Sequence, residues 1–422
     1  MTVLRRVIGR LRRAAPGRRR DSREDEWPIS PAVRTAELSD AFTEAFGEPP
    51  EGVWRAPGRI PLMGEHTDHH GGLVLPMALP WGVSVALTPA ASGSVELRSA
   101  QRPGEVVRFH TSDLHTGSPA GTGWAAHVAG VFWAARENGH LDPAAGARIL
   151  LDSDLPVGAS LASSAAVECA TLLALADVFG LDELARDRAA MARTALRAAK
   201  EFVGVPTGTM DHNASLRCAE GRALFLDCRT GGARTMPLPL DEAGLRLLLV
   251  DTRVRHRPND PTRGPAARSA DCARAARLLG VDTLRDVEDL ADALGTLPDP
   301  VLARRVRHVV TETHRVNATV GLMRAGSLPE IGPVLSASHL SLRDQFEVSR
   351  PELDLAVDVA VGAGARGARM TGGGFGGTAI ALVAEERLAQ VRHAVSEAFA
   401  RRRWRDPRFR EALPSEGAQR LG

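Results

Sequence analysis

The sequence predicts an α+β fold with two lobes, on three observations. The chain has 422 residues, of which 44% are hydrophobic and 25% charged, so it is globular and too long for one ordinary core. Short apolar runs typical of strands alternate irregularly with longer stretches of helical periodicity. This pattern continues from residue 31 without a low-complexity break or a detectable repeat. A lobe boundary is expected near residues 215–240.

Each expected element is defined by its apolar periodicity. The order is a helix at 36–46, strands at 83–87 and 95–98, a helix at 124–138, a strand at 148–151, a helix at 163–179, a buried strand at 245–251, mostly helix over 264–325, a strand at 380–383 after a glycine-rich loop, and a last helix.

The first 27 residues form a separate basic segment with eight arginines before Asp21. We expect a disordered tail; a short interfacial helix on anionic lipid is the alternative. The chain contains no apolar run approaching the roughly 18 to 20 residues of a membrane span, and we expect no integral membrane association.

Charge and rare residues exclude several classes of protein. Fifty-three basic and 51 acidic residues give a net charge of +2, so no overall field favours nucleic acid. The only lysine, Lys200, lies in neither a Walker A loop nor a protein-kinase context. The four cysteines show no CxxC spacing, which argues against zinc fingers and predicts a reducing, cytoplasmic location.

Residues 56–72 gather Arg59, Glu65, His66 and Asp68 between glycines. A sugar offers many hydroxyls that need donors and acceptors together, and these side chains supply both. A metal site that also uses the neighbouring histidines and a plain surface turn remain alternatives.

Residues 155–168 form a glycine- and serine-rich loop that opens a helix. The free N–H groups and positive dipole of a helix N-terminus bind phosphate without lysine. Ser163 and Ser164 could cap the helix, bind phosphate or reach a magnesium ion. An ordinary N-cap on a core helix is the alternative.

Two further segments complete the set. Gly372, Gly374 and Gly377 match GxGxxG but precede a strand, which excludes a dinucleotide fold and leaves a loop for close backbone approach. Asp211 follows a Gly/Pro-punctuated loop. One carboxylate facing a hydroxyl, with one arginine, suffices for phosphoryl transfer, so we pair Asp211 with Arg59.

In this order, the four segments resemble the galactokinase branch of the GHMP small-molecule kinases over about residues 52–420. The sugar signature corresponds to Gly58–Ile60 and Gly64–Asp68, and MTGGGFGG is complete at Met370–Gly377. The phosphate loop PxGxGLSSSA is matched at Pro156, Gly158, Leu161, Ser163, Ser164 and Ala165, and FVGVPCGIMDQ at Phe202–Pro206, Gly208, Met210 and Asp211.

The resemblance implies a two-lobed GHMP kinase fold, with a mixed sheet and a left-handed βαβ crossover in residues 28–225 and an α/β sandwich in 226–422. It implies ATP, Mg²⁺ and phosphorylation of the anomeric hydroxyl of galactose. We also expect the protein to be a monomer. Asp211 and Arg59 would be catalytic, and Ser164 would bind the metal. The implied sugar contacts are Glu65, His66, Asp68 and Gly208; the implied ATP contacts are Pro156, Gly158, Ser160, Ser163, Ser164, Gly373 and Gly374.

Several positions depart from the family pattern. His69 and His70 replace a Tyr-Asn pair, and residues 257–265, before Cys272, lack the tyrosine that the family carries there. Pro61 replaces an asparagine, Ser160 a glycine and Ala162 a serine, and Ala199 stands where the family has a glutamate twelve residues before the catalytic aspartate. Alanine has no oxygen for a hard cation. A galactokinase-like sugar or nucleotide binder with impaired catalysis, and a kinase for a different sugar, are therefore the alternatives.

Overall fold

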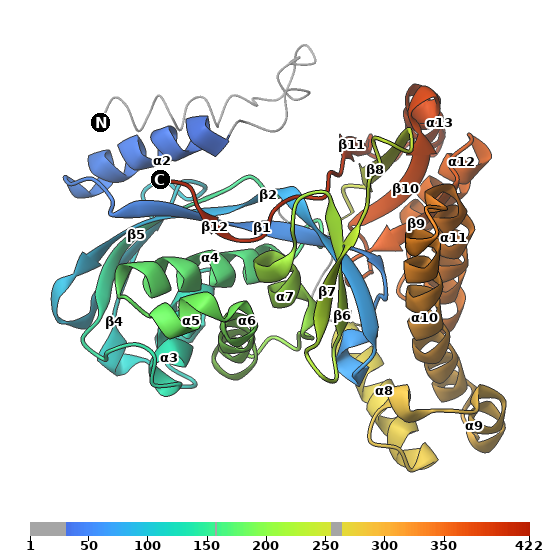
Figure 1. Cartoon of the computed structure of the whole chain (residues 1–422), viewed down its shortest axis with the longest axis horizontal. Helices are drawn as coiled ribbons and strands as arrows, with labels where there is room; N and C mark the ends of the chain where they lie inside the picture. Colours follow the sequence, from blue (N-terminus) through green and yellow to red (C-terminus); the bar gives the residue numbers. More distant parts are fainter. Residues whose placement is uncertain (1–30, 157, 255–263) are drawn as a thin grey trace.

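Two β-sheets, each covered by helices, form the part of the chain that this computed structural model describes, residues 31–156, 158–254 and 264–422 (Figure 1). The basic tail expected at 1–27 lies outside these residues. The predicted α+β class is confirmed. The predicted lobe boundary and the handedness of the crossover stay predictions.

The larger sheet has eight strands among the described residues and is mixed, as predicted. Its main path runs β12-β1-β2-β5-β3-β4, and β6 extends it by pairing with β2 and β7. Only β3 and β5 pair in parallel. The strands are β1 (Gly52–Met63), β2 (Leu73–Ala90), β3 (Ser94–Ser99), β4 (Val106–His110), β5 (Gly146–Ser153), β6 (Arg222–Asp227), β7 (Ala233–Pro237) and β12 (Gln419–Arg420).

The smaller sheet is antiparallel, in the order β11-β8-β10-β9. Its strands are β8 (Leu245–Asp251), β9 (Gly367–Thr371), β10 (Thr378–Ala384) and β11 (Arg408–Glu411). The helices of this half are α8 (Pro265–Leu279), α9 (Leu290–Thr296), α10 (Pro300–Arg324), α11 (Ile331–Ser341), α12 (Pro351–Gly362) and α13 (Leu388–Arg401).

The helices of the first half lie on opposite sides of the larger sheet (Figure 1). They are α2 (Pro31–Phe46) on one side and α3 (Ala126–Glu137), α4 (Ser163–Val178), α5 (Asp182–Arg186), α6 (Arg188–Arg197) and α7 (Met210–Arg217) on the other. Helix α4 packs against β1, β2, α3, α6 and α7. Because strands and helices pack around α4 on nearly all sides, its sequence is apolar on nearly every face and not amphipathic.

Strand β1 was not expected from its sequence, because Pro57, Gly58 and Pro61 interrupt the strand pattern. The structure accommodates them with irregularities in the β1–β2 register between Pro57 and Arg59 and between Pro61 and Met63. Bulges relieve the pairing that proline cannot make, and they redirect neighbouring side chains. Pro61 is therefore tolerated here, and Arg59 lies next to a redirected part of the strand.

Helix α11 packs backbone to backbone on β9. A Cβ added at Gly367 would lie 1.8 Å from the carbonyl oxygen of Gly332, and one added at Gly332 would lie 2.3 Å from the carbonyl oxygen of Arg366. Both contacts involve main-chain atoms, which cannot rotate away. The helix can approach β9 this closely only because both positions are glycine.

We predict that Gly367→Ala lowers the free energy of unfolding by about 1–3 kcal/mol or more, because the added methyl overpacks this contact. The matched control is Gly321→Ala in α10, where an added Cβ meets no atom within 4 Å. That change should be neutral or stabilise by up to about 1 kcal/mol through helix propensity. Urea denaturation followed by circular dichroism measures both, and equal effects would contradict the packing explanation.

Candidate active site

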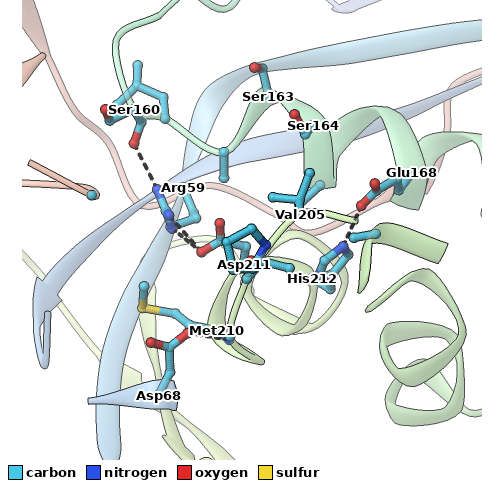
Figure 2. Close-up of a pocket in the computed structure, with 18 of the residues that line it drawn as sticks. Arg59, Asp68, Ser160, Ser163, Ser164, Glu168, Val205, Met210, Asp211 and His212 are labelled. Atoms are coloured by element: carbon cyan, nitrogen blue, oxygen red, sulfur yellow. Dashed lines mark hydrogen bonds and ion pairs between the residues drawn. The ribbon is translucent and has the colours of Figure 1, made fainter. Parts of the chain in front are cut away.

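A cavity of about 410 Å³ lies between the larger sheet, the start of α4 and the start of α7. Figure 2 shows Arg59, Asp211, Ser163 and Ser164 facing this space. The structure therefore brings three of the four predicted segments together directly, and the glycine loop reaches the cavity through Gly373.

Arg59 and Asp211 form an ion pair, as their predicted pairing requires (Figure 2). Arg59 Nε and Nη2 lie 2.8 and 2.6 Å from the same carboxylate oxygen, Oδ1. Arg59 is buried in β1, whereas 19% of the Asp211 side chain is exposed. The guanidinium thus fixes one oxygen of the carboxylate. The other oxygen, Oδ2, accepts no hydrogen bond from the described residues of the site.

Arg59 also holds the phosphate loop. Its Nη1 donates to the carbonyl oxygen of Ser160 over 3.0 Å, and its backbone N–H donates to that of Leu161 over 3.1 Å. Ser160 and Ala162 both adopt left-handed backbone conformations, with φ of 62° and 59°. The family glycine replaced by Ser160 therefore stands at a position with positive φ, where a side chain costs about 1 kcal/mol.

The N-terminus of α4 opens into the cavity without a side-chain cap. Its N-cap residue is Ala162, and Ser163 and Ser164 are exposed in its first turn. The uncapped N–H groups carry the positive end of the helix dipole and suit an anion. Pro156, Gly158 and Ser160 line the same end of the cavity, whereas the ordinary N-cap alternative has no capping hydrogen bond to support it.

Glu65 and His66 lie where the glycine loop meets the cavity. Glu65 accepts hydrogen bonds from Arg369 and, over 3.1 Å, from the backbone N–H of Gly372. Burial raises the pKa of Glu65 to about 7, against the opposing charge of Arg369. Burial also lowers the pKa of His66, so its ring is neutral; its Nε2 is buried without a hydrogen-bond partner. An unsatisfied buried ring nitrogen beside an empty space suits a hydroxyl ligand.

Asp68 and Gly208 lie in direct contact at the wall of the cavity. Asp68 Oδ2 accepts from the backbone N–H of Met210 over 3.4 Å, and a Cβ at Gly208 would lie 1.8 Å from that oxygen. Gly208 must therefore be glycine for the chain to turn toward Asp211. The alternative of a metal site in this segment is not supported, because the described residues hold no group of three or more metal-ligating side chains.

The glycine loop between β9 and β10 packs on the phosphate loop. A Cβ at Gly372 would lie 2.5 Å from Cβ of Ser160, and Thr378 Oγ1 donates to the carbonyl of Ala159 over 2.7 Å. Gly373 lines the cavity. Gly374 instead lies against Val348, so the nucleotide contact expected of it stays a prediction.

The position of the missing glutamate is also on the cavity wall. Ala199 is buried in a π-helical turn (Ala198–Val203) and lines the cavity without an oxygen to offer. Lys200 and Glu201 are exposed, and Glu201 pairs with Arg197 on the surface over 3.0 Å. Neither neighbour is among the residues that line the cavity.

Sequence reasoning missed a buried cluster beside Asp211. Glu168 Oε1 lies 2.7 Å from His127 Nδ1, and its Oε2 lies 2.5 Å from His212 Nε2. Burial alone would raise the pKa of Glu168, but the two histidine hydrogen bonds outweigh it and hold that pKa below its usual value. The i, i+4 spacing of Ser164 and Glu168 was the only sequence signal, since it places both on one face of α4.

Comparisons with known proteins agree with this geometry. The galactokinase galactose-binding signature matches residues 40–89, the GHMP kinases N-terminal domain matches 126–218 and the GHMP kinases C-terminal domain matches 319–401. Galactokinase of Streptomyces coelicolor is 46% identical over 387 residues, which cover 91% of this chain and 98% of that protein. Galactokinase of Mycobacterium tuberculosis is 40% identical over 366 residues, covering 86% and 97%.

Solved structures give the same result. The crystal structure of Lactococcus lactis galactokinase complexed with galactose superimposes with a TM-score of 0.86 at 28% identity, covering 92% of this chain and 99% of that one. Methanococcus jannaschii mevalonate kinase, at 16% identity and a TM-score of 0.60, shares the fold. With nearly the whole length of curated galactokinases matched at more than 40% identity, the chain belongs to the galactokinase family of the GHMP kinases.

Proposed function

We propose that the protein is an ATP-dependent galactokinase that phosphorylates the anomeric hydroxyl of galactose. The observation that carries this proposal is the Arg59–Asp211 pair, placed between an uncapped helix N-terminus and a polar pocket. Phosphoryl transfer depends chiefly on such positioning and charge stabilisation. The family membership supports galactose as the sugar.

Asp211 acts on the hydroxyl of the sugar. Because Arg59 holds Oδ1, the other carboxylate oxygen, Oδ2, accepts the proton of the anomeric hydroxyl. The oxygen of that hydroxyl attacks the terminal phosphorus of ATP. The bond from that phosphorus to the bridging oxygen of ADP breaks, and ADP leaves. Arg59 stabilises the carboxylate and the negative charge of the transferring group.

The chain's own residues hold the two substrates on opposite sides of this pair. The α4 N-terminus and the loop from Pro156 to Ser164 receive the triphosphate, and Gly373 approaches it from the glycine loop. Glu65, His66 and Asp68 receive the sugar hydroxyls, with Gly208 giving Asp68 its room.

A magnesium ion carried by the nucleotide would lie next to Ser164 in this site. Ser164 offers an exposed hydroxyl at the cavity wall, and Ala199 offers nothing. Without a cluster of ligating side chains in the described residues, the phosphates and water must complete the shell, as Mg²⁺ commonly permits. When bound, the ion would neutralise phosphate charge next to Ser164.

The remaining expectations concern membrane association, location and oligomeric state. Within the described residues, no helix has the length and apolar character needed to cross a bilayer. All four cysteines are free, which favours the proposed reducing, cytoplasmic location. The monomeric state stays a prediction.

We predict that Asp211→Asn lowers kcat about 10²–10⁴-fold with galactose, because the amide cannot accept the proton. ADP release with ATP, Mg²⁺ and a panel of hexoses and pentoses measures this. The matched control is Asp177→Asn, which removes an arginine-paired carboxylate of α4 that does not line the cavity and should leave kcat unchanged.

The same panel separates the alternatives. Turnover confined to another sugar would correct the substrate. A folded wild-type protein that binds galactose by calorimetry but releases no ADP would be the impaired binder, and full turnover by Asp211→Asn would overturn the catalytic assignment.

We also predict that Gly372→Ala raises the KM for ATP and lowers kcat together, by about tenfold or more, since the added methyl collides with Ser160 at a φ of 82°. Gly362→Ala at the end of α12, whose added Cβ meets no atom within 4 Å and which does not line the cavity, should have a clearly smaller effect. Steady-state kinetics at varied ATP compares the two, and equal losses would show that the contact between the loops is not what matters.

A further inference from the structure

Glu168 joins three helices directly behind the proposed reaction centre. It belongs to α4, His127 to α3 and His212 to α7, and all three residues line the cavity. Figure 2 shows Glu168 and His212 in contact, with Ser164 on the same helix and Asp211 adjacent to His212. Glu168 is 0% and His212 1% exposed. Both of its carboxylate oxygens are taken up by the two histidines, so Glu168 acts on the site through them.

The hydrogen bonds of this cluster have a defined direction. An ionised carboxylate only accepts, so His127 donates through Nδ1–H and His212 through Nε2–H. Charge-assisted bonds of this kind are short and strong in a low-dielectric interior. The orientation of the His212 ring, and with it the first turn of α7, is therefore fixed from α4.

Helix α7 is tied to β1 on its other side. Ser215 Oγ donates to the carbonyl of Pro57 over 2.7 Å, and Asp211 is held by Arg59. Asp211 thus lies between an anchor to β1 and an anchor to α4. The anchor on α4 is Glu168, which lies one helical turn after Ser164. Ser164 is at the N-terminal end of α4, where the triphosphate is proposed to lie.

We propose that Glu168 is a positioning residue, which through His212 and His127 fixes the Asp211 carboxylate relative to the phosphate-binding end of α4. This inference rests on the proposed function. The other contacts to sugar and nucleotide come from the segment of Glu65 to Asp68, from the phosphate loop and from the glycine loop. Loss of the link therefore changes the alignment of the reacting groups and leaves both substrates bound.

Two amide substitutions test the link at one position. The side-chain nitrogen of Gln reaches where His Nε2 lies, whereas that of Asn reaches only as far as Nδ1. His212→Asn should lower kcat about tenfold to hundredfold, as expected for a misplacement near 1 Å, with the KM for galactose and ATP changed less than about threefold. His212→Gln should keep kcat within about threefold of the wild type.

The matched control is Thr194→Val in α6. It removes a hydrogen bond that the hydroxyl of the buried Thr194 accepts from Asn138, the residue after α3, over 3.0 Å and away from the cavity. Its kcat should be unchanged even where its melting temperature falls. Wild-type kcat in a folded His212→Asn protein, equal losses for Asn and Gln, or a loss in Thr194→Val as large as that in His212→Asn would each overturn the proposal.

A readout independent of turnover separates this inference from the proposed function. In a crystal structure of the His212→Asn protein, the Asp211 carboxylate should be displaced from Arg59, and in the His212→Gln protein it should not. If the wild type phosphorylates no sugar, the proposed function fails and this comparison alone decides the positioning role. If His212→Asn does not fold, Glu168→Gln is measured in the same way, with the same loss of kcat expected and wild-type kcat overturning the proposal.

Discussion

The ion pair between Arg59 and Asp211 is the interaction on which the rest of the site depends. It joins strand β1 of the larger sheet to the first turn of α7, and a further hydrogen bond from Arg59 reaches the phosphate loop. One buried guanidinium therefore sets the distance between the proposed base and the proposed phosphate site. Breaking such a pair would leave an uncompensated buried charge, so the geometry is maintained without any ligand.

The two glycine-containing loops follow from the same constraint. With the phosphate loop drawn to Arg59, its residues 159 and 160 lie against the glycine loop, and a side chain at Gly372 has no space. Ser160 adopts a left-handed conformation that its side chain disfavours, and the surrounding contacts must hold it there. The phosphate loop is thus held by Arg59 at Ser160 and by Thr378 at Ala159, next to the strained residue.

Much of this arrangement could be predicted from the sequence because its signals are local. A helix N-terminus, a loop before a strand and a carboxylate after a Gly/Pro-rich turn each depend on a few neighbouring residues, and the structure places Arg59 and Asp211 together as expected. Strand β1 was missed because its prolines and glycine resemble a loop until the register irregularities are seen.

The Glu168 cluster could not be predicted for a different reason. His127 and His212 lie 41 and 44 residues from Glu168 along the chain, and the three residues belong to three different helices. Nothing in the periodicity of α4 marks Glu168 either, because that helix is buried on nearly all sides. Pairings of this kind are set by how the helices pack, and spacing within a single segment does not reveal them.

Ala199 makes this packing matter more. In the described cavity, Arg59 offers positive charge and the uncapped end of α4 offers free N–H donors to a triphosphate, whereas position 199 contributes no metal ligand. Under the proposed function, a cation that arrives with the nucleotide would be held mainly by phosphate and water, and the protein would control the position of the phosphates through the helix end. Under that condition the distance from the α4 terminus to Asp211 decides the alignment of donor and acceptor. The link between α4 and α7 through Glu168 supplements Arg59 in keeping that distance constant.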